Sequence, residues 1–273
     1  MFQYAYSKAL QKKGFDIRLD TKPFKKFKLH GGFQLDKYKI DIQCASDQEI
    51  NKFRVYGLFP KLKNKLGFIN KNILKEDFGY FDQNLLHPNK NVYIIGNFQS
   101  EKYFANIRDT LLDSFIIQKK ESDYLKFLKK EINLSKISCS IHIRRGDYLN
   151  KNNISTHGVC SLEYYLKSIE IMKANFENIN FFIFSDDMLW TKKNLNIKNA
   201  IYVENELNRI PHEDIHLMSL CNHNIIANSS FSWWGAWLNK NINKLIIAPK
   251  IWFADYYLQN RTKDLICKDW TRI

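Results

Sequence analysis

Residues 138–148 read Ser138-Cys-Ser-Ile-His-Ile-Arg-Arg-Gly-Asp-Tyr148, and this stretch predicts a strand that runs into a charged turn. Arg144 and Arg145 arrive together, and Gly146 lets the backbone turn. In an open α/β sheet, ligands bind at the carboxyl ends of strands, where two guanidiniums can hold a diphosphate by bidentate hydrogen bonds. We therefore interpret the turn as a phosphate site, with a solvated basic loop as the alternative. The strand itself is indicated by apolar residues at every second position: Ile137, Cys139, Ile141 and Ile143.

Length and composition bound the possible classes of protein. The chain has 273 residues, 45% of them hydrophobic, which suits one large or two medium domains and excludes wholesale disorder. A net charge of +14 favours anionic partners such as a nucleotide, an acidic membrane surface or a nucleic acid. The five cysteines are scattered and form no Cys-x-x-Cys pair, which predicts a reducing compartment. With neither a signal peptide nor an apolar run of about 18 residues, we expect a cytoplasmic protein.

The second half of the sequence alternates strand-like with helix-like segments. Such alternation is typical of a doubly wound parallel sheet. Helices are predicted to begin at Ser161 and Pro211, and a third spans 233–238. The predicted strands are 137–143, 181–184, 200–203, 223–227 and 245–249.

The first half is less regular. Residues 41–90 show only weak periodicity and are expected to be helices and loops. We expect a domain boundary near 119–136, and hence two domains, 1–130 and 131–273. The other predicted elements of this half are a helix at 1–13, strands at 16–20 and 91–96, and helices at 103–118 and 119–134.

Three polar turns follow predicted strands of the second half, at 144–147, 185–187 and 228–232. Parallel strands bring such turns to one end of a sheet, where nucleotides bind. The adjacent Asp186 and Asp187 suit recognition of the N1 and N2 donors of guanine better than a divalent metal, and capping of a helix is the structural alternative. The stretch 228–232 offers donors for a phosphate at a helix N-terminus, or simply caps that helix.

One motif is set aside. His212-Glu-Asp-Ile-His216 fits the zinc protease pattern H-E-x-x-H, and Pro211 would place both histidines in the first turns of a helix. A third ligand at a diagnostic spacing is missing, and a five-residue pattern arises easily by chance. We therefore expect no metal site here, but a helix start whose acidic residues are favoured by the helix dipole.

Three motifs taken together carry a family resemblance. They are His142-x-Arg144-Arg145-Gly-Asp147, Phe184-Ser-Asp-Asp187 and Ile226-Ala-Asn-Ser-Ser-Phe-Ser-Trp-Trp-Gly-Ala-Trp-Leu238. The set resembles the bacterial α-1,2-fucosyltransferases of glycosyltransferase family 11, whereas the first motif alone is shared with α-1,6- and protein O-fucosyltransferases. Met1–Ala5, Phe33–Tyr38 and Phe98–Phe104 are similar to that family as well, so the likeness runs from the first residue to about Trp252.

The resemblance implies a GT-B-like α/β fold of two Rossmann-like domains, the C-terminal one being the doubly wound parallel sheet. The second domain would bind GDP-fucose, and the first would bind a galactoside-containing glycan acceptor. The implied reaction is an inverting transfer of L-fucose to the galactoside 2-hydroxyl in a surface glycan such as lipopolysaccharide, without a metal or other cofactor. Another fucosyl linkage is the alternative within the family.

The resemblance also implies roles for individual residues. Arg144 and Arg145 would grip the diphosphate, and Arg144 would act in catalysis by stabilising the leaving charge. Asp147 is a candidate general base, although a salt bridge that orients either arginine is an equally good reading. Glu101 is a second candidate base on the acceptor side, together with Gln99. The implied donor-binding residues are His142 and Asp186 at the guanine, their neighbour Asp187, and Asn228, Ser229, Ser230, Phe231 and Ser232 at phosphate and ribose.

The N-terminus departs from the family pattern. Family members usually carry a strand and a Gly-Gly-Leu-Gly-Asn-Gln loop just before the segment that matches Met1–Ala5. Two readings of this departure stay open: the start of the sequence is mis-assigned, or the chain is a truncated nucleotide-binding remnant. For the chain as it stands we expect weak or no transferase activity.

Other classes compete with the transferase. A nucleic-acid binder is suggested by the charge and by the aromatic content of 15%, but the lysines spread over the whole chain and no nucleic-acid motif is present, so we expect no nucleic-acid partner. The positive surplus instead suggests peripheral contact with an anionic inner membrane.

Overall fold

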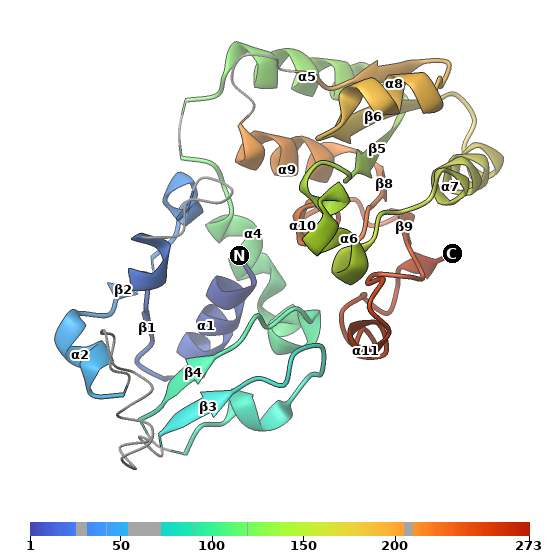
Figure 1. The fold of residues 1–273 in the computed structure, drawn as a ribbon. Helices are drawn as coiled ribbons and strands as arrows, with labels where there is room; N and C mark the ends of the chain where they lie inside the picture. The colour runs from blue at the N-terminus through green and yellow to red at the C-terminus, as the bar shows by residue number, and fades with distance from the viewer. Residues whose placement is uncertain (26–31, 42, 54–71, 90, 119, 205–209) are drawn as a thin grey trace. The chain divides into compact units, whose positions relative to one another are not determined.

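The computed structural model describes residues 1–273 except 26–31, 42, 54–71, 90, 119 and 205–209 (Figure 1). The chain divides into two compact units. The first comprises Met1–Gln118 with Lys263–Leu265, and the second comprises Lys119–Thr262 with Ile266–Ile273. The division lies earlier than the expected 130/131. Helix α5 (Asp123–Leu134) belongs to the second unit because it packs on α9 (Pro211–Leu220), where Glu213 accepts hydrogen bonds from the backbone and hydroxyl of Ser122 at 3.2 and 2.6 Å.

The second unit is built on a parallel sheet with β5 (Ile137–Ile143) inside it. Among the described residues its strand order is β10-β9-β8-β5-β6-β7, and every pair is parallel. The chain leaves β5 toward β6 and β7, then returns to β8 on the other side. The α/β class and the doubly wound sheet expected from the sequence are confirmed. The remaining strands are β6 (Ile179–Ser185), β7 (Ala200–Tyr202), β8 (His223–Ile225), β9 (Ile246–Ala248) and β10 (Thr271–Arg272).

Helices cover both faces of this sheet. Cys139, Ile141 and Ile143 face α7 (Leu162–Asn175), whose Tyr165 and Met172 share their core. The alternate residues of β5 face the other way, toward α9 and α10 (Ser230–Trp237). Both faces of β5 are therefore buried, and neither is a solvent-exposed polar side. The other helices of the unit are α6 (Lys151–His157), α8 (Met188–Asn194) and α11 (Tyr256–Gln259).

Small polar residues fill the second face of β5. Ser138 and Ser140 are each 1% exposed. The hydroxyl of Ser138 donates to the side-chain oxygen of Asn222 at 2.8 Å, and the Asn224 amide donates to the hydroxyl of Ser140 at 2.7 Å. The Asn239 amide donates in turn to the Asn224 side-chain oxygen at 2.8 Å. These bonds satisfy buried polar atoms and hold β8 in register beside β5.

The first unit holds, among its described residues, two separate pairs of parallel strands. One pairs β1 (Arg18–Leu19) with β2 (Gln43–Cys44), and the other pairs β3 (Ile73–Lys75) with β4 (Tyr93–Ile95). A single Rossmann-like sheet was expected there. Strands β2 and β3 were missed, because the stretch 41–90 was expected to hold only helices and loops. Residues 54–71 of that stretch lie outside the described residues. The described part of the unit also contains the helices α1 (Phe2–Lys12), α2 (Asp47–Asn51) and α4 (Arg108–Ser114).

The helix expected at 103–118 is shorter than predicted. Two 3₁₀ turns, Glu101–Tyr103 and Ala105–Ile107, precede α4, and Phe104 between them has a non-helical backbone with φ −149° and ψ 5°. A 3₁₀ turn also places residues i and i+3 on one face, so the apolar spacing alone did not distinguish the two. The residues that carried the prediction are all in the core: Phe104, Ile107, Leu111 and Phe115. Further 3₁₀ turns among the described residues of this unit are Lys22–Lys25, Leu35–Lys37 and Gln83–Leu86.

Candidate functional site at the ends of strands β5, β6 and β8

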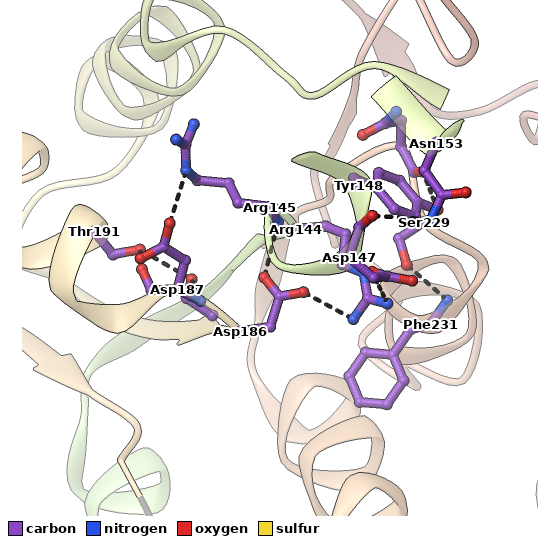
Figure 2. Close-up of polar contacts among 12 residues, drawn as sticks. Arg144, Arg145, Asp147, Tyr148, Asn153, Asp186, Asp187, Thr191, Ser229 and Phe231 are labelled. Atoms are coloured by element: carbon purple, nitrogen blue, oxygen red, sulfur yellow. Dashed lines mark hydrogen bonds and ion pairs between the residues drawn. The ribbon is translucent and has the colours of Figure 1, made fainter. Parts of the chain in front are cut away.

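The two arginines that follow β5 are held by carboxylates rather than left in solvent. Arg144 pairs with Asp147 at 2.5 Å and with Asp186 at 2.9 Å. Arg145 pairs with Asp187 at 3.2 Å, and its backbone N–H donates to Asp186 at 2.8 Å. Figure 2 shows the guanidiniums diverging, with Arg144 toward Asp147 and Arg145 toward Asp187. The side chains are only 20% and 16% exposed, so neither arginine belongs to a solvated loop.

The carboxylates that follow β6 play two different parts. Asp186 receives both arginines, one through its guanidinium and the other through its backbone N–H. Asp187 also accepts a hydrogen bond from the backbone of Trp190 at 3.1 Å and so caps α8. The capping role left open for this pair is thus confirmed for Asp187. Together with Asp147 they give the cluster three carboxylates against two guanidiniums, a formal surplus of one negative charge.

This balance bears on what the cluster can bind. A diphosphate meets no unpaired guanidinium here, so it must compete with Asp147 or Asp186 for Arg144. A ligand that also carries hydrogen-bond donors for the displaced carboxylate removes part of that cost, and guanine offers such donors. The arrangement therefore favours a ligand that joins a donor-rich base to an anionic group over a simple anion.

Gly146 lies in the turn because the space beside it is taken. A Cβ atom built there would stand 2.8 Å from Oδ2 of Asp186, the same oxygen that pairs with Arg144. A larger residue would push that carboxylate away. The glycine is thus required by close approach between the turns after β5 and β6.

The side chain of Asn228, in the turn after β8, is engaged in hydrogen bonds within the protein. Its amide nitrogen donates to the carbonyls of His157 at 2.9 Å and Trp252 at 3.0 Å. Its side-chain oxygen accepts from the thiol of Cys160 at 3.4 Å. Both amide hydrogens are therefore engaged, and the side chain is 3% exposed. The side chain thus ties together three segments around the site, and the contact of Asn228 with the donor stays a prediction.

The residues after Asn228 begin α10 earlier than the predicted start at 233. Ser229 caps this helix by accepting from the backbone of Phe231 at 3.3 Å. Ser232 is fully buried, and its hydroxyl donates to the carbonyls of Ser229 and Ala227 at 3.3 and 3.5 Å. Only Ser230 is exposed. The hydroxyls of Ser229 and Ser232 are thus structural, and the first-turn N–H groups of α10 are what this turn offers a phosphate.

His142 stands at the end of β5, on the face that looks toward α10. It is 2% exposed, and its ring centroid lies 5.3 Å from that of Phe231. The contact of His142 with guanine stays a prediction. In the structure as it stands, the imidazole supports the start of α10.

Three residues at this end of the sheet were not predicted. The guanidinium of Arg145 lies 3.8 Å from the ring centroid of Trp190, so a cation–π contact holds it as well as Asp187. Tyr148 donates to the backbone carbonyl of Asn228 at 3.3 Å and bridges the turns after β5 and β8. Burial raises the pKa of Tyr148. His157, the last residue of α6, stacks on Tyr148 with ring centroids 4.7 Å apart. Tyr148 directly follows the arginine motif, which was a usable signal; Trp190 and His157 had none.

Gln99 and Glu101, expected on the acceptor side, lie in the first unit after β4, while the other predicted residues lie in the second. The turn between β4 and Gln99 is held by Glu76, which accepts from the backbones of Asn97 at 2.7 Å and Phe98 at 2.8 Å. Burial raises the pKa of Glu76. Gln99 and Glu101 are both half-buried beside this turn.

The H-E-x-x-H pattern is part of the framework. Pro211 begins α9 as expected, and Glu213 is 5% exposed and bonded to Ser122 at the start of α5. Outside the segments of uncertain placement, the chain gathers no group of three or more His, Cys, Asp or Glu side chains suited to a metal. In the part of the chain that the structure describes, no helix combines the length and the apolar character needed to span a bilayer.

Comparison with known proteins decides the family. The model of glycosyltransferase family 11 matches residues 61–273, which include all three polar turns. The chain belongs to this family. An alpha-1,2-colitosyltransferase of Escherichia coli is 35% identical over 100% of this chain and 94% of its own length. The O-antigen biosynthesis glycosyltransferase WbnK of Escherichia coli is 32% identical over 97% of this chain and 94% of its own length.

More distant relatives are fucosyltransferases. A galactoside alpha-(1,2)-fucosyltransferase 2 of Sus scrofa is 23% identical over 55% of this chain and 46% of its own length. Among solved structures, the alpha-1,6-fucosyltransferase NodZ soaked with GDP-fucose superposes with a TM-score of 0.45 at 13% identity, covering 87% of each chain. The family 11 assignment made from the motifs is confirmed.

Proposed function

We propose that this glycosyltransferase transfers a 6-deoxyhexose of the L-fucose type from its GDP-activated form to the 2-hydroxyl of a galactoside in a surface glycan. The observation that carries the proposal is that Arg144 and the start of α10 follow the neighbouring strands β5 and β8, at the point where the strand order reverses. Strands β5 and β8 are neighbours there, and Tyr148 bridges their ends. Nucleotides bind at such a reversal point in doubly wound sheets.

An inverting glycosyl transfer requires stabilisation of the negative charge on the leaving oxygen. In an inverting transfer the acceptor hydroxyl attacks the anomeric carbon while the bond from that carbon to the diphosphate breaks, and negative charge develops on the GDP oxygen. Arg144 would stabilise that charge, and Arg145 and the first-turn N–H groups of α10 would bind the other phosphate oxygens. Asp186 would exchange one of its arginine contacts for guanine donors, and Asp187 would keep Arg145 in place.

Asp147 would steady Arg144 through their 2.5 Å ion pair. This is the orienting role that the sequence left open beside the general-base role. A carboxylate that holds the guanidinium in line with the leaving group supports catalysis through its partner. Neither a metal nor another cofactor enters this scheme, and that remains a prediction, as do the cytoplasmic location and peripheral contact with an anionic inner membrane.

Two donor sugars fit this proposal, fucose and colitose. Fucose is supported by the three motifs and by the mammalian relatives, and colitose by the 35% identical relative named for it. The two sugars differ in one group, because colitose lacks the 3-hydroxyl of fucose. A site that bonds this hydroxyl discriminates strongly against the sugar without it, whereas an apolar site separates the two only weakly.

The decisive experiment is transfer with purified chain, GDP-fucose or GDP-colitose, and a β-galactoside acceptor. We expect one donor to be used at least about tenfold better in kcat/KM than the other, and the product to carry an α-1,2 linkage by NMR. Transfer should be equal with and without a chelator. Binding of GDP without turnover of either donor would contradict the proposed function and leave a nucleotide-binding protein. Transfer to another hydroxyl would correct only the linkage.

A further inference from the structure

His157 is a titratable group that the proposed function does not yet use. It ends α6, and its backbone carbonyl accepts from Asn228 at 2.9 Å. Its ring stacks on Tyr148 at 4.7 Å with planes 14° apart, and its centroid lies 5.7 Å from that of Phe253. The imidazole is therefore fixed by two aromatic rings and by the residue that organises the turn after β8.

This fixed imidazole lies among the groups that follow β5 and β8. Tyr148, on which it stacks, is bonded to the Asn228 carbonyl and faces Arg144, whose guanidinium carbon is 5.2 Å from the Tyr148 ring centroid. His157 is half-buried, so part of it remains accessible. Within the described residues, neither ring nitrogen has a hydrogen-bond partner. By contrast, Nδ1 of His223 accepts from the Leu245 backbone at 3.0 Å.

The protonation state of His157 suits proton acceptance. Burial lowers its pKa, the carboxylate of Asp147 acts in the opposite sense, and Arg144 lowers it further. The pKa of His157 therefore lies below its ordinary value of 6.5, so the imidazole is neutral at pH 7. A neutral imidazole is the commonest general base in enzymes.

We propose that His157 is the general base of the transfer, an inference that rests on the proposed function. A ring nitrogen takes the proton of the acceptor hydroxyl as its oxygen bonds to the anomeric carbon. The bond from that carbon to the diphosphate breaks, and its electron pair leaves on GDP beside Arg144. The products are the glycoside, GDP and an imidazolium, which Asp147 stabilises until the proton passes to water.

The charged groups around His157 determine how the reaction responds to pH. Asp147 and Arg144 act on the ring from the turn after β5. On the side of Phe253, the backbone N–H of Asp255 donates to the Thr156 carbonyl, and its carboxylate caps α11 by accepting from Leu258 at 2.8 Å. Because the pKa of His157 is lowered, the base is available at pH 7 and is lost only as pH falls below 6.5 toward that lowered pKa.

The test is His157→Phe, which keeps a ring for stacking on Tyr148 and removes both nitrogens. We expect kcat to fall about 100-fold or more at pH 7, with the GDP dissociation constant within about twofold of the original chain. The acid limb of kcat/KM against pH should be present in the original chain and absent from the residual activity of the variant. His87→Phe, at an exposed histidine of the first unit, is the matched control and should change none of these.

The outcomes separate the two proposals. If the original chain transfers sugar and His157→Phe does so equally well, or keeps the acid limb, the base assignment is overturned and the proposed function stands. If the original chain transfers neither sugar, the proposed function is overturned and the base assignment falls with it. A variant that is inactive but also binds GDP weakly identifies His157 as a structural residue and overturns its role as a base.

Discussion

The turn after β5 and the turn after β8 look alike in sequence and are used differently in the structure. Both are short, polar and follow a buried strand. In the first, Arg144, Arg145 and Asp147 hold charges against one another at partly exposed positions. In the second, Asn228 and Ser232 are buried at 3% and 0% and bonded to carbonyls of their own surroundings.

The difference follows from what each turn must satisfy. The turn after β8 meets α6, α10 and the segment at Trp252, whose carbonyls would be buried without partners if Asn228 were absent. The turn after β5 faces the neighbouring turn after β6, where charged groups can pair with one another and still exchange partners. Polar residues that lie in one turn are therefore structural or ligand-binding according to the backbone groups around them.

The sharpest test of the contrast is Arg144→Ala. We expect GDP affinity to fall by about 100-fold or more, since a bidentate charge-assisted contact of about 3 kcal/mol is lost and three carboxylates then face the diphosphate with one guanidinium. Calorimetry with GDP measures this. Arg144→Lys, which keeps the charge without the fork, should recover only part of the loss. Unchanged GDP affinity in Arg144→Ala would end the assignment of this turn to the donor.

The opposite result is expected at Asn228. Asn228→Ala leaves the carbonyls of His157 and Trp252 without their donor, so the free energy of unfolding should fall by about 3 kcal/mol. Urea denaturation measures it, and Asn243→Ala, at an exposed asparagine, is the matched control. In the fraction that stays folded at low temperature, GDP affinity should lie within about threefold of the original. A variant that is as stable as the original chain but fails to bind GDP would show that Asn228 binds the ligand and is not structural.

A smaller effect is expected at Gly146. In Gly146→Ala the added methyl displaces Asp186, so Arg144 and the Arg145 backbone lose a shared anchor and GDP affinity should drop about tenfold, or about 1.4 kcal/mol. Gly14→Ala is the comparison variant: it strains a backbone at φ +93° with nothing within 4 Å, so it should lower stability and leave GDP binding alone. Equal GDP affinity in the two variants would count against the close packing of the turns after β5 and β6.

Sequence reasoning recovered the second unit well and the first unit poorly. The strand at 137–143 was placed by its apolar residues at every second position, and the strand at 181–184 by its continuous apolar run. Strands β2, β3 and β10 were missed because they are short and lie in stretches that show no regular apolar pattern. Helices α6 and α8 were missed because each is 7 residues long and polar, and α10 begins at a serine that the motif assigned to the turn.

The candidate site divides along the same line. Local spacing was enough to place Arg144, Arg145, Asp186 and Asp187 at neighbouring strand ends, since parallel strands bring their carboxyl ends together. It did not distinguish Asn228, whose partners lie 24 to 71 positions away in the chain. Trp190 and His157 were not predicted for the same reason. Only the folded chain packs Arg145 on Trp190 and Tyr148 on His157.

The amino-acid order by itself determined the parallel sheet, the family and the charged turn after β5, because hydrophobic period, motif order and charge are properties of neighbours in the chain. Only the tertiary structure decided which polar groups are committed to the framework and which can meet a ligand. That depends on which backbone carbonyls and carboxylates other segments bring within about 3 Å, where hydrogen bonds form.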